Sequence, residues 1–307
     1  MAAFPKLTIV AGPTASGKTA FALKLAAETR ADIVNADSRQ VYTQMDIGTN
    51  KEPLVGTGEK FSLNGFVLER FLVDNTNTGG WLFDLVNPDQ KFSVAEYQQL
   101  ATGLIAELGS NGRKVIIVGG TGLYIDALIR NYNLNPAEPN SQLREKVKNY
   151  SVDELFDLLW ELDPERAQKL NDSDLFNPRR LVRAIEIATA ANDKTQMTNK
   201  QIDYEMYYPE YDREQLYAKI DKRVETMFEA GLVGEVKNLI KLGYKDTKPM
   251  QGIGYKEVLL YLNNEINYND CVEKIKQDHR NYVARQITWF EGEGRGYDLT
   301  KINFQNS

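Results

Sequence analysis

A glycine-rich segment near the N-terminus constrains the fold of this 307-residue chain more than any other feature. It reads Gly-Pro-Thr-Ala-Ser-Gly-Lys-Thr and matches the pattern G-x-x-x-x-G-K-S/T, between an apolar run at 7–11 and an Ala-, Leu- and Lys-rich run at 20–27. In such a strand–loop–helix unit, backbone N–H groups surround phosphate oxygens and the lysine neutralises their charge. The segment predicts a site for a di- or triphosphate, built from Gly12, Pro13, Thr14, Ala15, Ser16, Gly17, Lys18 and Thr19.

ATPases and GTPases carry an Asp at the end of a second strand, and this chain lacks it at the expected position. In those proteins the Asp holds the magnesium shell, but here the apolar run 115–118 leads into Gly119, Gly120 and Thr121. A carboxylate, Asp37, follows the short apolar run 32–36 instead. Neighbouring parallel strands share one crevice at their carboxyl ends, so we expect Asp37 near the phosphate loop. It could bind metal or accept a proton there, or only cap the following turn.

The order of the predicted elements indicates an α/β protein. Strands and helices alternate over residues 1–130, which predicts a P-loop NTPase-like parallel sheet flanked by helices. Ser93 and Glu96 form a capping box for a helix at 93–108. We expect a core of residues 1–130 plus 205–307, with C-terminal helices at 212–230, 233–242 and 269–290 and a frayed tail at 302–307. Residues 131–204 form an inserted helical domain, with helices at 152–160, 164–170 and 177–187 between polar boundary segments at 131–140 and 191–211.

Composition excludes several classes of protein. One cysteine, Cys271, leaves no internal disulfide and no cysteine-based zinc cage, and one histidine, His279, leaves no multi-histidine metal site. His279 lies on the apolar stripe of the 269–290 helix, which favours a core or interface position. The sequence contains no basic leader and no run of about 18 apolar residues, so we expect a soluble, cytoplasmic protein that does not bind membranes.

The net charge of −6 argues against a general affinity for nucleic acid, so such a partner would need a local basic patch. Residues 177–187 offer one. They predict a helix with proline in its first turn, with Leu181 and Ile185 on the packing side and three arginines on the other: Arg179, Arg180 and Arg183. Taken alone, this pattern is more typical of a solvated helix face than of a binding surface.

Six further motifs follow the phosphate loop in a defined order. They are Asp-Ser-Arg-Gln-Val-Tyr at 37–42, Met-Asp-Ile-Gly-Thr at 45–49, Val-Gly-Gly-Thr-Gly-Leu-Tyr at 118–124, Asn-Pro-Arg-Arg-Leu-Val-Arg-Ala-Ile-Glu at 177–186, Gln-Gly-Ile-Gly-Tyr-Lys at 251–256 and Ala-Arg-Gln-Ile-Thr-Trp-Phe at 284–290. Together they span nearly the whole chain. The sequence closely resembles the bacterial tRNA dimethylallyltransferases.

The resemblance implies a reaction and a set of roles. The family transfers a dimethylallyl group from dimethylallyl diphosphate to the exocyclic N6 of the adenosine 3′ of the anticodon in tRNA, and diphosphate is released. The loop would then hold a leaving group. This fits the absence of an Asp after the 115–118 strand, because the reaction activates no water molecule. By resemblance the catalytic residues are Asp37, Thr14 and Arg223: Asp37 accepts the N6 proton, Arg223 binds the same diphosphate as the loop, and Mg²⁺ lies at Thr19.

The same resemblance predicts the tRNA contacts. The matching positions are Asp37, Ser38, Arg39, Gln40, Thr121, Arg144, Arg179, Arg180, Arg183, Gln251, Gly252 and Lys256. The partner is the anticodon stem-loop, the inserted helical domain is the tRNA-binding domain, and we expect a monomer. The arginines of 177–187 read in this context mainly as contacts to the RNA backbone.

One segment departs from the family pattern. Most members carry His-His-Leu-Ile-Asp or a close variant before the 93–108 helix, whereas this chain has Trp-Leu-Phe-Asp at 81–84. We expect Asp84 to keep its place and the histidine contribution to be lost or replaced. Two strands, 66–73 and 81–86, would be joined by a polar turn at 75–80, in which Gly79 and Gly80 could form a mobile flap.

Three other functions compete with this interpretation. A free-adenylate isopentenyltransferase shares the loop and the acceptor chemistry, but it would not need Arg144 or the arginine helix. A P-loop kinase for a small metabolite would turn over ATP, and the missing carboxylate after the 115–118 strand argues against it. A catalytically silent nucleotide-binding module would have no need of Asp37, Thr14 and Arg223 in the family pattern.

Overall fold

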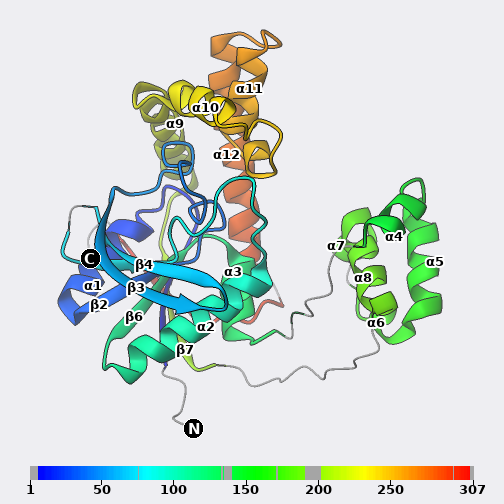
Figure 1. Ribbon diagram of the computed structural model, residues 1–307, viewed down its shortest axis with the longest axis horizontal. Helices are drawn as coiled ribbons and strands as arrows, with labels where there is room; N and C mark the ends of the chain where they lie inside the picture. The colour runs from blue at the N-terminus through cyan, green and yellow to red at the C-terminus, as the bar shows by residue number, and fades with distance from the viewer. Residues whose placement is uncertain are drawn as a thin grey trace. The chain divides into compact units, whose positions relative to one another are not determined.

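The computed structural model describes residues 6–74, 76–132, 134, 140–170, 172–190, 202–292 and 294–304. The chain divides into two compact units, one of residues 1–131 with 199–307 and one of residues 132–198 (Figure 1). Within the described part of the chain, no helix has the length and apolar character needed to cross a membrane.

An eight-stranded sheet forms the centre of the first unit, in the order β3-β4-β5-β2-β6-β1-β7-β8. The strands are β1 (Leu7–Ala11), β2 (Ala31–Asn35), β3 (Leu54–Leu63), β4 (Phe66–Val73), β5 (Gly79–Trp81), β6 (Lys114–Gly119), β7 (Tyr204–Pro209) and β8 (Leu299–Ile302). All neighbours from β5 to β8 pair in parallel, as predicted for an α/β P-loop fold. The edge hairpin β3–β4 is antiparallel, so the sheet is mixed rather than purely parallel.

Helices cover both faces of the sheet, which explains why its central strands are apolar throughout. On one face, α1 (Lys18–Thr29) packs its buried Phe21 and Ala22 against Val10, Ile33 and Ile116. On the other face lie α2 (Val94–Ser110) and α3 (Gly122–Ile129), whose apolar side chains join a core with Ile9, Val34 and Ile117. Successive residues of each strand therefore point to opposite cores.

The capping box predicted for α2 is confirmed. Ser93 Oγ accepts from Glu96 N at 3.2 Å, and Glu96 Oε2 accepts from Ser93 N at 2.6 Å. The helix continues through Gly109 and ends at Ser110.

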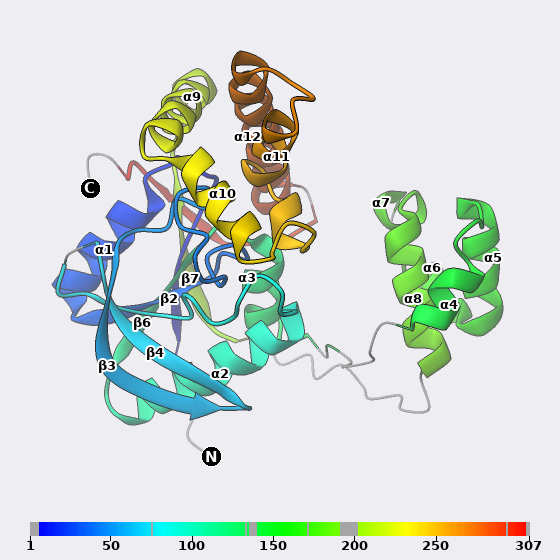
Figure 2. The ribbon, with the colours of Figure 1, turned by 45° about the horizontal axis from the view of Figure 1, so that its top comes forward.

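Four C-terminal helices gather beyond the carboxyl ends of the parallel strands (Figure 2). They are α9 (Arg213–Glu229), α10 (Leu232–Lys241), α11 (Tyr255–Leu262) and α12 (Tyr268–Glu291), with a 3-10 turn at Pro249–Gln251. Their core includes Val41, Tyr42 and Met45 from the segment after β2, so the helices hold that segment in place. The predicted helices at 212–230, 233–242 and 269–290 are confirmed, whereas α11 was not predicted.

The second unit is a bundle of short helices: α4 (Ser141–Lys146), α5 (Val152–Leu162), α6 (Pro164–Gln168), α7 (Asp172–Leu175) and α8 (Pro178–Ala190). It has its own core, in which Leu155 and Leu159 of α5 pack with Leu181 and Ile185 of α8. The helices expected at 152–160, 164–170 and 177–187 are present. Most of the two polar boundary segments, at 135–139 and 191–201, lies outside the described residues.

The strands expected at 66–73 and 81–86 are confirmed in part: β4 and β5 are antiparallel neighbours, but β5 covers only Gly79–Trp81. The edge hairpin turns at Asn64-Gly65, both with positive φ (51° and 81°), and pairs β4 with the unpredicted β3. Gly79 and Gly80 are buried in β5, between β2 and β4, and form no flap. A Cβ on Gly79 would lie 2.3 Å from both Arg70 Nε and Asp32 Oδ1, so glycine is required there for close packing.

The polar boundary at 191–211 and the tail also differ from expectation. Tyr204–Pro209 forms β7 beside β1, although its sequence alternates too weakly to predict a strand. Ile302 belongs to β8, and the buried Phe304 stacks on Phe21 with ring centroids 4.5 Å apart. Residues 305–307 of the predicted tail lie outside the described residues.

Candidate active site

The glycine-rich loop connects β1 to α1, and its backbone requires residues that tolerate unusual dihedral angles. Gly17 caps α1 at a φ of 88°, and Ala15 adopts a φ of 64°. A Cβ on Gly12 would lie 2.7 Å from Pro209 Cδ, so only glycine fits against β7. The N-terminus of α1, where a helix dipole favours an anion, therefore opens at the carboxyl end of the sheet.

A glutamine from the far end of the chain fixes this loop. Gln286 of α12 is buried, and its Oε1 accepts from Thr14 N at 2.9 Å while its Nε2 donates to Gly120 O at 2.9 Å. One side chain thus joins the loop after β1 to the loop after β6. Gln286 belongs to the motif at 284–290, whose sequence gives no sign of this contact.

Two cationic side chains lie close to this loop, and each makes one long hydrogen bond to a backbone carbonyl. Lys18 Nζ donates to Pro13 O at 3.3 Å, and Arg223 Nη2 of α9 donates to Thr49 O at 3.5 Å. Burial lowers the pKa of Lys18 to about 8 and that of Arg223 to about 10, although the charges of Asp37 and Glu52 oppose both shifts. Two desolvated cations that repel one another favour the binding of an anion. The role of Glu52 was missed because an isolated Glu in a polar segment carries no signal.

Asp37 follows β2 and is held by local hydrogen bonds. Its N–H donates to Asn35 Oδ1 at 3.0 Å, and its Oδ1 accepts from Arg39 N at 2.8 Å. One carboxylate oxygen of Asp37 therefore caps the following turn. Oδ2 has no hydrogen-bond partner in the described residues, and the negative charge acts on both Lys18 and Arg223. The carboxylate therefore shares the crevice of the phosphate loop and has an oxygen available for a ligand.

The loops after β2 and β6 are joined by hydroxyl groups. Thr121 Oγ1 accepts from Ser38 N at 3.0 Å and lies 3.3 Å from Ser38 Oγ. Gln40 Nε2 donates to the carbonyls of Thr49 and Asn50, at 3.3 and 3.1 Å. These contacts order the backbone on both sides of Asp37.

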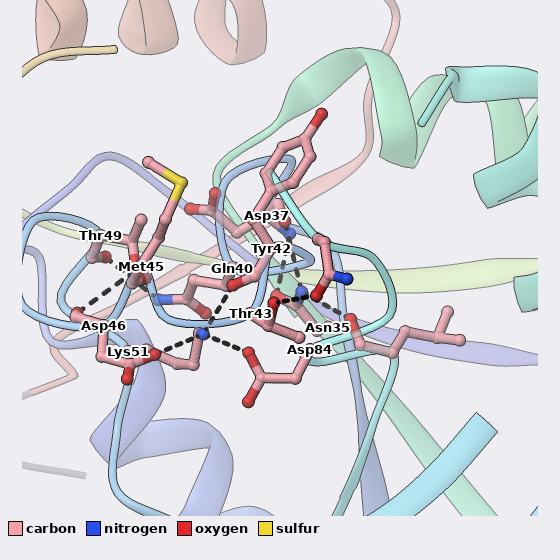
Figure 3. Close-up of polar contacts among 12 residues, drawn as sticks. Asn35, Asp37, Gln40, Tyr42, Thr43, Met45, Asp46, Thr49, Lys51 and Asp84 are labelled. Carbon is pink, nitrogen blue, oxygen red and sulfur yellow. Dashed lines mark hydrogen bonds and ion pairs between the residues drawn. The ribbon is translucent and has the colours of Figure 1, made fainter. Parts of the chain in front are cut away.

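A buried lysine organises the rest of the segment after β2 (Figure 3). The side chain of Lys51 is 1% exposed, and its Nζ donates to Tyr42 O at 2.9 Å, to Asp46 Oδ1 at 2.6 Å and to Asp84 Oδ1. Burial raises the pKa of Asp84, and the charge of Lys51 opposes that shift. Asp84 of the atypical 81–84 segment therefore supports the segment that carries Asp37.

The Met-Asp-Ile-Gly-Thr motif at 45–49 is a carboxylate-bound turn. Glu235 of α10 accepts from the N–H groups of Asp46, Ile47 and Gly48, at 2.9, 2.7 and 3.0 Å. Tyr255 Oη donates to the same carboxylate at 2.7 Å, and a Cβ on Gly48 would lie 2.5 Å from the Tyr255 ring. The motifs at 45–49 and 251–256 thus meet through Glu235, a residue that sequence reasoning missed.

The Gln251–Lys256 segment approaches the segment after β2 through Gly252. A Cβ on Gly252 would lie 3.7 Å from Arg39 Cζ, so the Arg39 guanidinium lies beside this glycine. Lys256 Nζ forms ion pairs with Asp278 at 2.8 Å and Glu257 at 3.2 Å, and the Gln251 side chain is exposed.

Trp81 has a structural role. Its Nε1 donates to Asp32 Oδ2 at 3.0 Å, and Arg70 binds the same carboxylate in a bidentate manner, at 3.0 and 2.8 Å. Burial alone would raise the pKa of Asp32, but the hydrogen bonds from Arg70 and Trp81 outweigh burial and lower it. The tryptophan thus anchors β5 to β2.

The remaining predicted residues lie in the helical unit. Glu186 of α8 is 2% exposed and accepts from Arg144 Nε at 2.7 Å and from Arg183 Nη1 at 2.9 Å. Arg180 pairs with Asp174, whereas Arg179 is exposed and makes no ion pair within the described residues. The four arginines are therefore not equivalent, since two of them are oriented by a buried carboxylate.

The structure thus brings together residues 12–19, 37–40, Thr121, Arg223 and 251–252 in the first unit, and the four arginines separately in the second. Among the described residues, no group of three or more His, Cys, Asp or Glu side chains is arranged to hold a metal ion.

Comparison with known proteins identifies the family. The IPP transferase family matches residues 78–293, and the isopentenyl transferase family matches residues 5–79. A tRNA dimethylallyltransferase of Thermoanaerobacter sp. is 38% identical, covering 97% of this chain and 91% of that protein, and one of Clostridioides difficile is 38% identical, covering 93% and 88%.

Solved structures agree with these matches. The tRNA isopentenylpyrophosphate transferase of Bacillus halodurans superposes with a TM-score of 0.67 at 33% identity, over 97% of this chain and 90% of that one. A eukaryotic dimethylallyltransferase acting on tRNA has a TM-score of 0.75 at 22% identity, over 98% and 75% of the chains, which supports the shared fold. The chain belongs to the IPP transferase family, whose named relatives are tRNA dimethylallyltransferases.

Proposed function

We propose that this protein transfers a dimethylallyl group from dimethylallyl diphosphate to N6 of the adenosine 3′ of the anticodon in tRNA. The observation that carries the proposal is the arrangement of two half-buried cations, Lys18 and Arg223, around the charge of Asp37 at the phosphate loop. The reaction breaks the bond between the allylic carbon and the diphosphate oxygen, forms an N6–C bond and releases one proton from N6.

The donor half of the site stabilises the leaving group. Diphosphate gains negative charge as the allylic C–O bond breaks, and the partly desolvated Lys18 and Arg223 would interact more strongly with that charge than fully solvated cations would. The N–H groups of residues 12–19 and the N-terminus of α1 act in the same direction. Thr14 is held in place through its N–H by Gln286, so its side chain would contact the bound diphosphate from a fixed backbone.

The acceptor half of the site removes the proton. The lone pair of an adenine amine is delocalised into the ring, so the nitrogen is a poor nucleophile until its proton is accepted. Asp37 Oδ2 is the group proposed for this role, because Oδ1 is already occupied by Arg39 N. The adenine must leave its stack to reach the carboxylate, at a cost of a few kcal/mol.

The residues present fit a magnesium ion bound together with the diphosphate. Thr19 offers a partly exposed hydroxyl in the first turn of α1, beside the N–H groups that would hold the diphosphate. Mg²⁺ commonly takes only one or two protein ligands and completes its shell with phosphate oxygens and water. When bound, the ion would neutralise part of the charge on the departing diphosphate.

We further propose that residues 131–204 form an inserted RNA-binding domain between the two parts of the catalytic core. Arg144, Arg179, Arg180 and Arg183 would contact the RNA backbone, and Phe176, which is 78% exposed before α8, offers a surface on which a base can stack. Ser38, Arg39, Gln40, Thr121, Gln251, Gly252 and Lys256 would contact the anticodon loop at the catalytic site. All these residues come from one chain, so the proposal requires only a monomer.

The decisive experiment offers the protein labelled dimethylallyl diphosphate and Mg²⁺ with either an anticodon stem-loop RNA or AMP. We expect label in the RNA and none in AMP. Transfer to AMP alone would identify a free-adenylate isopentenyltransferase. ATP turnover without prenyl transfer would identify a kinase and contradict the proposal.

A further inference from the structure

His279 on α12 is buried without hydrogen-bond partners. The residue is 7% exposed, and neither ring nitrogen has a partner among the described residues. Leaving a buried polar group unsatisfied is unfavourable, so a partner is expected in some functional state. The apolar stripe explains why position 279 faces inward, but it does not explain why the residue is polar.

The packing of α9 against α12 places Arg223 opposite His279. The helices run antiparallel, with Asp221 paired to Arg280 through Arg280 Nε at 3.1 Å and Glu225 paired to Lys276 at 2.9 Å. On α9, Arg223 lies three residues after Ile220 and four before Met227, and on α12 His279 lies midway between Ile275 and Val283. Ile220 packs in one cluster with Val283 and Met227 in another with Ile275, so Arg223 and His279 lie at the same level of the two apolar stripes. The charge of Arg223, after burial, lowers the pKa of His279, which falls to about 3. The imidazole is therefore neutral and has a nitrogen lone pair that can accept a hydrogen bond.

Arg223 has a complementary unsatisfied donor. Its Nε is buried and has no hydrogen-bond partner in the described residues, and Nη2 makes only the 3.5 Å contact to Thr49 O. An arginine that binds a diphosphate through its terminal N–H groups needs a fixed plane, because its bidentate geometry is directional. An acceptor for Nε would supply that plane.

We propose that His279 is a positioning residue for Arg223: in the donor-bound state, a ring nitrogen of His279 accepts a hydrogen bond from Arg223 Nε and orients the guanidinium toward the diphosphate. This inference rests on the proposed function, since it requires Arg223 to bind the donor. The bond is not made in the free protein, so His279 destabilises the free protein and contributes only when the donor binds.

His279→Leu and His279→Gln separate this role from packing. Leucine fills the site without a polar group, whereas glutamine retains an acceptor. We expect the Tm of free His279→Leu to rise by about 2–4 °C, the shift for one relieved unsatisfied polar group. Its Kd for dimethylallyl diphosphate should rise about tenfold, the equivalent of one lost hydrogen bond. Its kcat at saturating donor should fall as well, because Arg223 would stabilise charge that develops on the leaving group. His279→Gln should recover most of the affinity.

Two further variants complete the test, with donor affinity measured by calorimetry. Lys276→Gln removes an α9–α12 ion pair near His279 and should leave donor affinity unchanged, whereas Arg223→Ala should weaken it strongly. If wild type does not bind the donor, or Arg223→Ala binds it normally, the proposed function fails. If Arg223→Ala loses affinity while His279→Leu has a lower Tm and wild-type affinity, His279 is a packing residue and the inference is overturned. A His279→Gln variant as weak as His279→Leu would also overturn it.

Discussion

Replacing Gln286 with leucine tests whether one side chain holds the phosphate loop in position. The substitution removes the acceptor for Thr14 N–H and the donor for Gly120 O, two buried contacts of 2.9 Å each. Each orphaned backbone group costs about 1–3 kcal/mol, so the variant should lose about 2–6 kcal/mol of its free energy of unfolding. That is a large share of the roughly 5–15 kcal/mol typical of a folded domain.

Urea unfolding gives the loss directly, and thermal unfolding should show a Tm lower by roughly 5–20 °C. Gln277→Leu on the same helix is the matched control, because Gln277 is exposed and bonds only to Asn281. It should stay within about 0.5 kcal/mol of wild type. The KM for dimethylallyl diphosphate should rise in Gln286→Leu and remain unchanged in the control. If Gln286→Leu is as stable as the control, the loop does not depend on this contact.

Two other predictions follow from charge. Donor affinity should fall as the pH rises through about 8, where Lys18 loses its proton, whereas the contribution of Lys18 to folding stability should change in the opposite direction. The pKa of Lys18 in the folded protein lies below the unfolded value of 10.5, so the unfolded state binds more protons between these pH values and stability rises with pH there. Donor affinity that stays constant from pH 7 to 9 would show that Lys18 does not bind the donor. Replacing Arg179 and Arg180 together with alanine should weaken RNA binding and reduce its slope against log salt by about 1–2, because each phosphate contact contributes about 0.7–0.9. An unaltered slope would show that α8 does not face the RNA.

Local patterns were sufficient to predict much of the fold. The loop at 12–19, the Ser93–Glu96 capping box and the helix at 212–230 are short-range features, and each lies where the sequence indicated. The hairpin could also have been found. Asn64-Gly65 is a strong signal for a tight hairpin turn, and both residues have positive φ.

Long-range contacts could not be predicted in the same way. Gln286 and Thr14 are 272 positions apart, and Glu235 is 187 positions from Gly48. No periodicity or propensity encodes which distant carboxylate accepts three backbone N–H groups. Lys51 reads as an ordinary polar residue in a loop, and only the folded chain shows that its ammonium group is buried between Asp46 and Asp84.

Strand β7 was missed for a different reason. Its six residues, Tyr204–Pro209, contain a glutamate and end in proline, so they carry little signal of their own. They form a strand because β1 and β8 provide backbone partners on both sides. Tertiary pairing determined the structure there, as it commonly does for short strands.

Single-turnover transfer by Asp37→Asn tests the central claim most directly. Asparagine keeps the shape of the side chain and an oxygen that can accept from Arg39 N, but it cannot take the N6 proton. With saturating dimethylallyl diphosphate and an anticodon stem-loop RNA, we expect both ligands to bind as in wild type and the rate of N6 transfer to fall by about 10² or more. Transfer at the wild-type rate with both ligands bound would contradict the assignment of Asp37 as the group that deprotonates the adenine.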